Sequence, residues 1–131
     1  MGMYTELFVE GTLRSDAPDE VVRIVRYLFD KNADEDVLPV DLPGDRFFEC
    51  DRWKSVGNCS SSYHIPFSLS GVHVPHTGQL SFISRSDLKN YDNEIQKFVD
   101  WITPYCERLR GWSLYEEDEE PTVFTYENYG A

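Results

Sequence analysis

The clearest hydrophobic pattern in the chain lies between residues 88 and 105. Apolar side chains recur there at i, i+3, i+4 and i+7, the spacing that places them on one face of an α-helix. The four positions are Ile95, Phe98, Val99 and Ile102. Asn90 or Asp92 can accept backbone N–H bonds at the start of this helix, and Pro104 favours a helix end nearby. We therefore predict an amphipathic helix that packs on a sheet, with Trp101 on the flank of its apolar stripe.

A second helical pattern follows residues 15–17 and has the same spacing. Its apolar positions are Val21, Ile24, Val25 and Leu28. Ser15 or Asp16 is suited to cap this helix, and Pro18 is suited to its first turn. Because both helices follow strand patterns, we expect them to lie on the same side of an antiparallel or mixed sheet.

Alternating apolar and polar residues predict five strands. Their ranges are 3–14, 60–69, 78–85, 109–116 and 121–127. The residues of the first strand expected to face the core are Thr5, Leu7, Val9 and Leu13. Tyr4 and Phe8 fall on its other face, either exposed to solvent or in contact with a partner. Pro66 cannot donate a hydrogen bond to a ladder, so the second strand is expected at an edge of the sheet.

The order of these elements predicts the fold. The acidic segment 31–44 is expected to be a surface loop, and 46–56 to form short helical turns whose Phe47, Phe48 and Trp53 plug an edge of the core. We predict a single α+β domain over residues 1–131, a ferredoxin-like βαββαβ sandwich with an extra C-terminal strand and two helices on one face of a mainly antiparallel sheet. In the alternative arrangement, the C-terminal hairpin pairs with a second chain, as in a homodimer.

Five acidic residues in succession form the turn between the last two predicted strands. They are Glu116, Glu117, Asp118, Glu119 and Glu120. Their charges repel one another, which holds the turn open to water. One interpretation is a solvated turn that protects a sheet edge from aggregation. The other is a docking tip for a cation or a basic protein, flanked by Tyr115, Phe124 and Tyr126.

Composition narrows the functional classes. The chain has 24 acidic and 12 basic residues, a formal charge of −12, which argues against binding nucleic acid through phosphates and favours a protein partner with a basic patch. No apolar run approaches the roughly 20 residues of a membrane span, and no signal-peptide pattern is present. Three cysteines at irregular spacing argue against a secreted disulfide framework. We therefore expect a cytoplasmic protein with reduced thiols and no membrane contact.

No sequence motif indicates a reaction, a metal or a cofactor. Cysteines and histidines occur at positions 50, 59, 64, 73 and 76, a spacing that matches none of the usual zinc-ligand pairs. The run Asp34 to Asp36 lacks the glycine and alternating oxygen ligands of a calcium loop. We predict no metal site and no cofactor. An alternative stays open, a small metal- or cysteine-dependent hydrolase whose candidate residues are Cys59, His64, His73 and His76.

The segment LKNYDNEIQKFVDWITPY and the acidic, aromatic hairpin SLYEEDEEPTVFTY resemble small proteins encoded by tailed bacteriophages and prophages, particularly of actinobacteria. The resemblance covers about the last third of the chain, with weaker similarity in GDRFFECDRW and in the first strand and helix. That group has no assigned activity, so no residue role is carried over from it.

The resemblance implies a phage context, in which small acidic proteins often act by binding a host or defence protein. We therefore predict a non-enzymatic binding or inhibitory protein that acts in the host cytoplasm. Its predicted contacts are Tyr115, Glu116, Glu117, Asp118, Glu119, Glu120 and Tyr126. A minor virion or assembly component is a further alternative.

Overall fold

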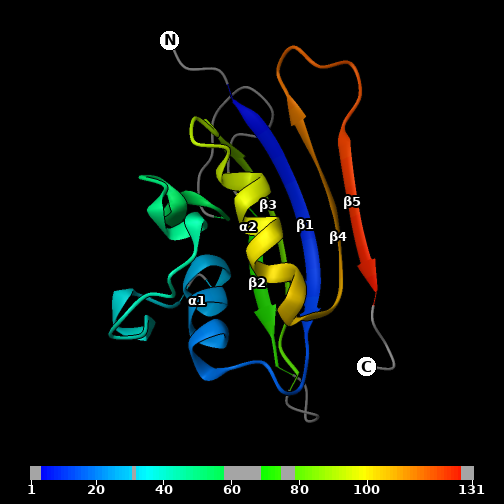
Figure 1. The fold of residues 1–131 in the computed structure, drawn as a ribbon. Coiled ribbons are helices and arrows are strands. Elements are labelled where there is room, and N and C mark those ends of the chain that lie inside the picture. The colour runs from blue at the N-terminus through cyan, green and yellow to red at the C-terminus, as the bar shows by residue number, and fades with distance from the viewer. Residues whose placement is uncertain (1–3, 31, 58–68, 75–78, 128–131) are drawn as a thin grey trace.

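The structure, a computed structural model, describes residues 4–30, 32–57, 69–74 and 79–127. Its five strands and two helices follow the predicted order (Figure 1). They are β1 (Thr5–Leu13), α1 (Asp19–Phe29), β2 (Leu69–His73), β3 (Ser81–Leu88), α2 (Glu94–Ile102), β4 (Cys106–Tyr115) and β5 (Thr122–Glu127). Short 3₁₀ turns at Arg46–Glu49 and Trp53–Ser55 lie between α1 and β2, where helical turns were predicted.

The five strands form one sheet in the order β2-β3-β1-β4-β5, and every neighbouring pair is antiparallel. The first four have the order of a ferredoxin-like sandwich, and β5 extends the sheet as a hairpin partner of β4. The predicted α+β class and the extra C-terminal strand are therefore confirmed. β1 lies in the centre, paired with β3 on one side and β4 on the other.

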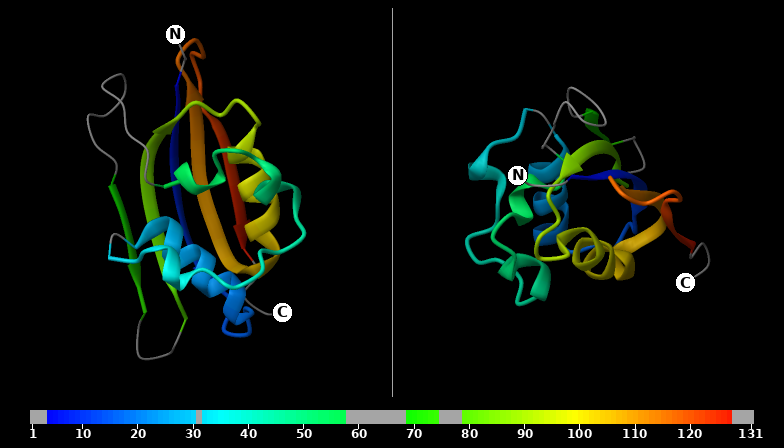
Figure 2. Two further views of the ribbon diagram at one scale, coloured as in Figure 1. Left: turned by 90° about the vertical axis from the view of Figure 1, so that its left-hand side faces the viewer. Right: turned by 90° about the horizontal axis from the view of Figure 1, so that it is seen from above.

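Both helices cover the same face of the sheet (Figure 2). Their apolar stripes are buried in one core together with the inward residues of β1, as the hydrophobic spacing predicted. Trp101 is also buried, and its ring lies 5.8 Å from that of Phe47 and 5.0 Å from that of Phe48. Trp101 therefore closes the core together with the 3₁₀ turns and is not offered to a partner.

Element boundaries differ from the predictions for local reasons. The N-cap of α1 is Pro18 rather than Ser15 or Asp16, and the Asp16 carboxylate instead accepts a hydrogen bond from Arg14. The expected range 60–69 lies outside the described residues except for Leu69, which begins β2. β2 does lie at an edge of the sheet.

The start of α2 is held as predicted, because Asn90 Oδ1 accepts the Ile95 N–H bond at 3.0 Å.

Candidate binding surfaces

The acidic tip, residues Glu116 to Glu120, joins β4 to β5 and extends beyond the other described elements (Figure 1). Glu116 anchors its base, since its side chain accepts the Tyr4 N–H bond at 2.8 Å and its own N–H donates to the Tyr4 carbonyl at 3.2 Å. The next four carboxylates, Glu117 to Glu120, are exposed. The tip therefore presents four exposed carboxylates, and its base is hydrogen-bonded to Tyr4, the residue that precedes β1.

The three aromatic residues expected beside the tip lie in different places. Tyr115 is at its base, where desolvation together with the charges of Glu117 and Glu116 raises the pKa of its hydroxyl. Tyr126 pairs with Leu109 at the opposite end of the hairpin, about 13 Å along β5 from Thr122. Phe124 and Tyr126 pack against the core on the helix side. Only Tyr115 is thus placed to share a contact with the acids.

A second surface lies on the face of the sheet opposite the helices, which we call the open face. One cross-strand register there runs through all five strands, from Leu69 to Arg85, Phe8, Trp112 and Val123. We call these five residues the apolar row, because Arg85 is its only charged member. The rings of Phe8 and Trp112 stack with centroids 6.1 Å apart. Residues in register share a face of a sheet, so these side chains form one continuous strip.

The apolar row forms part of a shallow hollow. Together with Ile83 from the adjacent register, its residues on β1 to β4 line a cavity of about 600 Å³ that opens to solvent. Leu69 and Ile83 are 47% and 48% exposed, and Val123 at the end of the row is 66% exposed. Large apolar side chains are thus accessible across the width of the sheet.

Charges of both signs flank the apolar row and neutralise one another. On one side lies Glu6, an almost fully buried carboxylate that is 2.7 Å from the guanidinium of Arg85 in the row. On the other side, Arg110 pairs with Glu10. These cross-strand pairs give the open face a charge pattern unlike that of the acidic tip.

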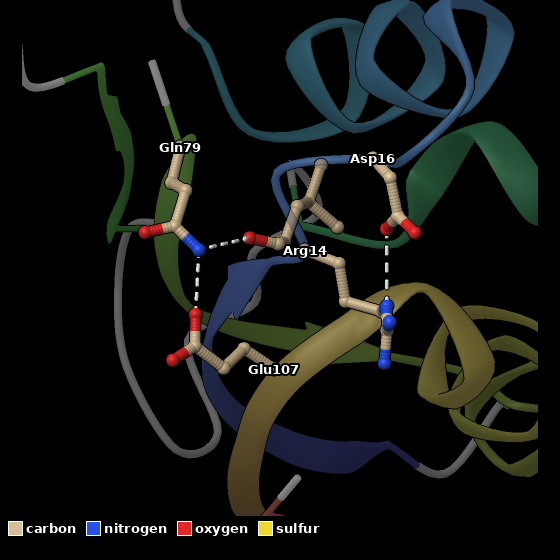
Figure 3. A network of polar contacts seen from close by, with 5 residues as sticks. Arg14, Asp16, Gln79 and Glu107 are labelled. Atoms are coloured by element: carbon tan, nitrogen blue, oxygen red, sulfur yellow. Dashed lines mark hydrogen bonds and ion pairs between the residues drawn. The ribbon is translucent and has the colours of Figure 1, made fainter. Parts of the chain in front are cut away.

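A polar network closes the end of the sheet that is remote from the acidic tip (Figure 3). Gln79 donates from Nε2 to Glu107 at 2.5 Å and to the Leu13 carbonyl at 3.5 Å. Arg14 donates to Asp16 at 3.1 Å, a bond that lowers the pKa of this carboxyl. The network joins the end of β1 to the segments that begin β3 and β4, which makes it a structural clasp.

The cysteines of the described chain lack the features of a nucleophile. Cys50 and Cys106 are buried free thiols. Desolvation raises the pKa of both, that of Cys106 to about 12, so neither is a thiolate near neutral pH. Among the described residues no cluster of three metal-ligating side chains occurs. The candidates Cys59, His64 and His76 lie outside the described residues, and His73 lies at the end of β2.

None of the described helices is long and apolar enough to cross a membrane. Comparisons with protein-family models, with curated proteins and with solved structures found no match to this chain.

Sequence reasoning found the acidic tip but only one residue of the apolar row. Phe8 is visible in the sequence because it alternates with core residues in β1. Trp112, Ile83 and Leu69 each sit in a different strand, so their alignment depends on register between strands far apart in sequence. The sequence signal that could have found Trp112 is the alternation within 109–116, because Leu109 is buried and Trp112 falls on the opposite face.

Proposed function

We propose that this protein is a non-catalytic binding protein that engages a basic surface of another protein through the acidic tip. The observation that carries the proposal is the geometry of Glu117 to Glu120, exposed carboxylates on a projecting hairpin whose base is held by Glu116. A pre-ordered base lowers the entropy cost of presenting these charges to a partner. Tyr115 adds an aromatic side chain of the type enriched at interfaces.

The net charge supports the same proposal. At −12 the chain attracts a basic surface from a distance, which raises the rate of encounter and makes binding sensitive to salt. We propose a bacterial host or defence protein as the partner, a choice motivated by the resemblance of the C-terminal third to phage proteins. The cytoplasm of the host is the corresponding site of action.

The proposal is tested by capture of partners from host lysate with a tagged chain, read by mass spectrometry. Reversing the four exposed tip acids to Lys should remove a specifically captured protein. The matched control reverses four exposed acids elsewhere, Glu20, Asp36, Asp41 and Asp51, and so makes the same change in net charge. We expect the control to retain the partner, and raising the salt concentration to weaken its capture from the unmodified chain.

Two results would contradict the proposal. Equal loss with the control variant would show that total charge matters and the tip does not. Capture that is unchanged by reversal of the tip would place the contact on another surface.

A further inference from the structure

We propose that the open face is the contact between two copies of this chain, with the apolar row of one copy packed on that of the other. This inference goes beyond the proposed function, because it depends on a surface with little net charge and on residues that are not part of the acidic tip. It assigns the protein as a homodimer whose acidic tips are not part of the contact.

The dimensions of the apolar row fit a macromolecular occupant. Five strands spaced about 4.8 Å apart make the row roughly 19 Å wide, and the strands extend the face by up to about 30 Å. A face of this size offers at most roughly 570 Å² per copy, which exceeds the roughly 500 Å² per partner that a specific interface needs. Exposed apolar side chains occur at both ends of the row, at Leu69 and Val123, and at Ile83 in the adjacent register.

The charge distribution selects a second copy as that occupant. Two chains that each carry −12 repel each other, so they associate best through a face with little net charge. The described part of the open face has three guanidinium groups, from Arg85, Arg108 and Arg110, against four carboxylates, which leaves one negative charge. The carboxylates are Glu6, Glu10, Asp87 and Glu127. A strongly basic partner would instead favour the acidic tip.

The apolar row also suits a symmetric contact. A two-fold axis places the same patch of both copies in contact, so the patch has to be complementary to itself. A strip of apolar side chains with Phe8 on the central strand meets this condition, since Phe8 of each copy lies near the middle of the row. The Glu6–Arg85 and Glu10–Arg110 pairs satisfy four of these charges within each copy, so burial of the paired groups does not separate them from their partners.

Sedimentation equilibrium over a range of protein and salt concentrations tests the dimer. The expected result is a mass that rises with concentration from 15.3 kDa toward twice this value. Salt should strengthen the dimer, because it screens the repulsion between two acidic chains while apolar contacts persist. Salt should weaken capture through the acidic tip, so the two proposals fail independently.

Variants at exposed positions locate the contact without disturbing the core. Ile83→Arg places a cation in the hollow and is expected to weaken dimerisation at least tenfold, although it moves the net charge toward zero. Val40→Arg makes the same change at a side chain that is fully exposed in the loop after α1, and should leave the dimer intact. Circular dichroism and melting temperature verify that both variants are folded.

Three outcomes would overturn the proposal. The first is a monomer at every concentration and salt. The second is a dimer that Ile83→Arg and Val40→Arg affect equally. The third is a monomer that binds a hydrophobic dye only when Ile83 is intact, which would assign the open face to a different apolar ligand.

Discussion

At the scale of single residues, Gly111 shows how closely the central strands approach. A Cβ at this position would lie 2.1 Å from the Phe8 carbonyl oxygen and 2.8 Å from the Phe124 ring. The oxygen belongs to the β1 backbone, which cannot move without breaking the ladder between β1 and β4. The absence of a side chain at Gly111 is therefore a condition for the pairing of these strands.

We expect Gly111→Ala to lower the free energy of unfolding by roughly 3 kcal/mol, as overpacking against a fixed backbone does. Gly71→Ala is the matched control, because Gly71 is also in a strand and has no atom within 4 Å of its would-be Cβ. Its effect should stay within about 0.5 kcal/mol. Denaturant unfolding of both variants measures the difference, and equal stabilities would contradict the close approach.

Cys106 gives a residue-scale prediction in pH. Burial raises the pKa of its thiol from 9.0 to about 12, so the unfolded chain releases this proton at a lower pH than the folded chain. Between these values the folded state binds more protons, and stability therefore falls as pH rises from about 9 to about 12. The total loss from this group is up to about 4 kcal/mol.

Unfolding midpoints measured from pH 8 to 11 check this expectation against Cys106→Ala. The variant should be less stable at neutral pH, because a buried side chain is shortened, yet its stability should fall less steeply above pH 9. Parallel curves for the two proteins would show that burial does not raise the pKa of Cys106 above its value in the unfolded chain.

At the scale of elements, the start of α2 depends on two asparagines with left-handed backbone. Asn90 and Asn93 have φ angles of 54° and 57°. Asn tolerates this region better than most residues, and the Asn90 side chain also caps the Ile95 N–H group. Conformation and capping thus select the same residue type at position 90.

Substitutions at Asn90 separate these two contributions. Asn90→Asp keeps the acceptor oxygen and should be nearly neutral. Asn90→Gly keeps the backbone freedom but lacks the cap, and Asn90→Ala lacks both, so Ala should cost more than Gly, about 1 to 2 kcal/mol in all. Thermal unfolding gives the order, and a Gly variant less stable than the Ala variant would contradict the left-handed conformation.

Helices could be predicted from the sequence more accurately than the pairing of strands. Both helices and the fold class could be predicted, because four apolar residues at helical spacing fix each buried face. The register of the sheet could not be predicted, since β1 pairs with strands more than sixty residues away. The acidic tip was visible as five consecutive letters, whereas the apolar row exists only when those long-range registers are set. The predicted place of Tyr126 beside the tip is wrong, because closeness in sequence does not show at which end of a hairpin a side chain lies.

At the scale of the whole molecule, sheet order predicts a gradient of local stability. Amides of β1 are bonded on both sides, whereas β2 and β5 are edges with one neighbour each. Native-state hydrogen exchange should be slowest in β1 and in the adjoining parts of β3 and β4, and fastest in the edge strands β2 and β5. Protection of β5 equal to that of β1 would contradict this order and would favour the alternative homodimer in which the hairpin edge pairs with a second chain.

The central position of β1 has a consequence for how the protein is made. β1 is translated before both of its neighbours, residues 81–88 and 106–115, which leave the ribosome after it. Until then the apolar side chains Leu7, Val9 and Leu13 have no sheet to join, so the nascent chain must carry them exposed or transiently sheltered by a chaperone. Completion of the sheet therefore waits until β4 and β5 have left the ribosome, and a message truncated before β4 yields a product that cannot reach this fold.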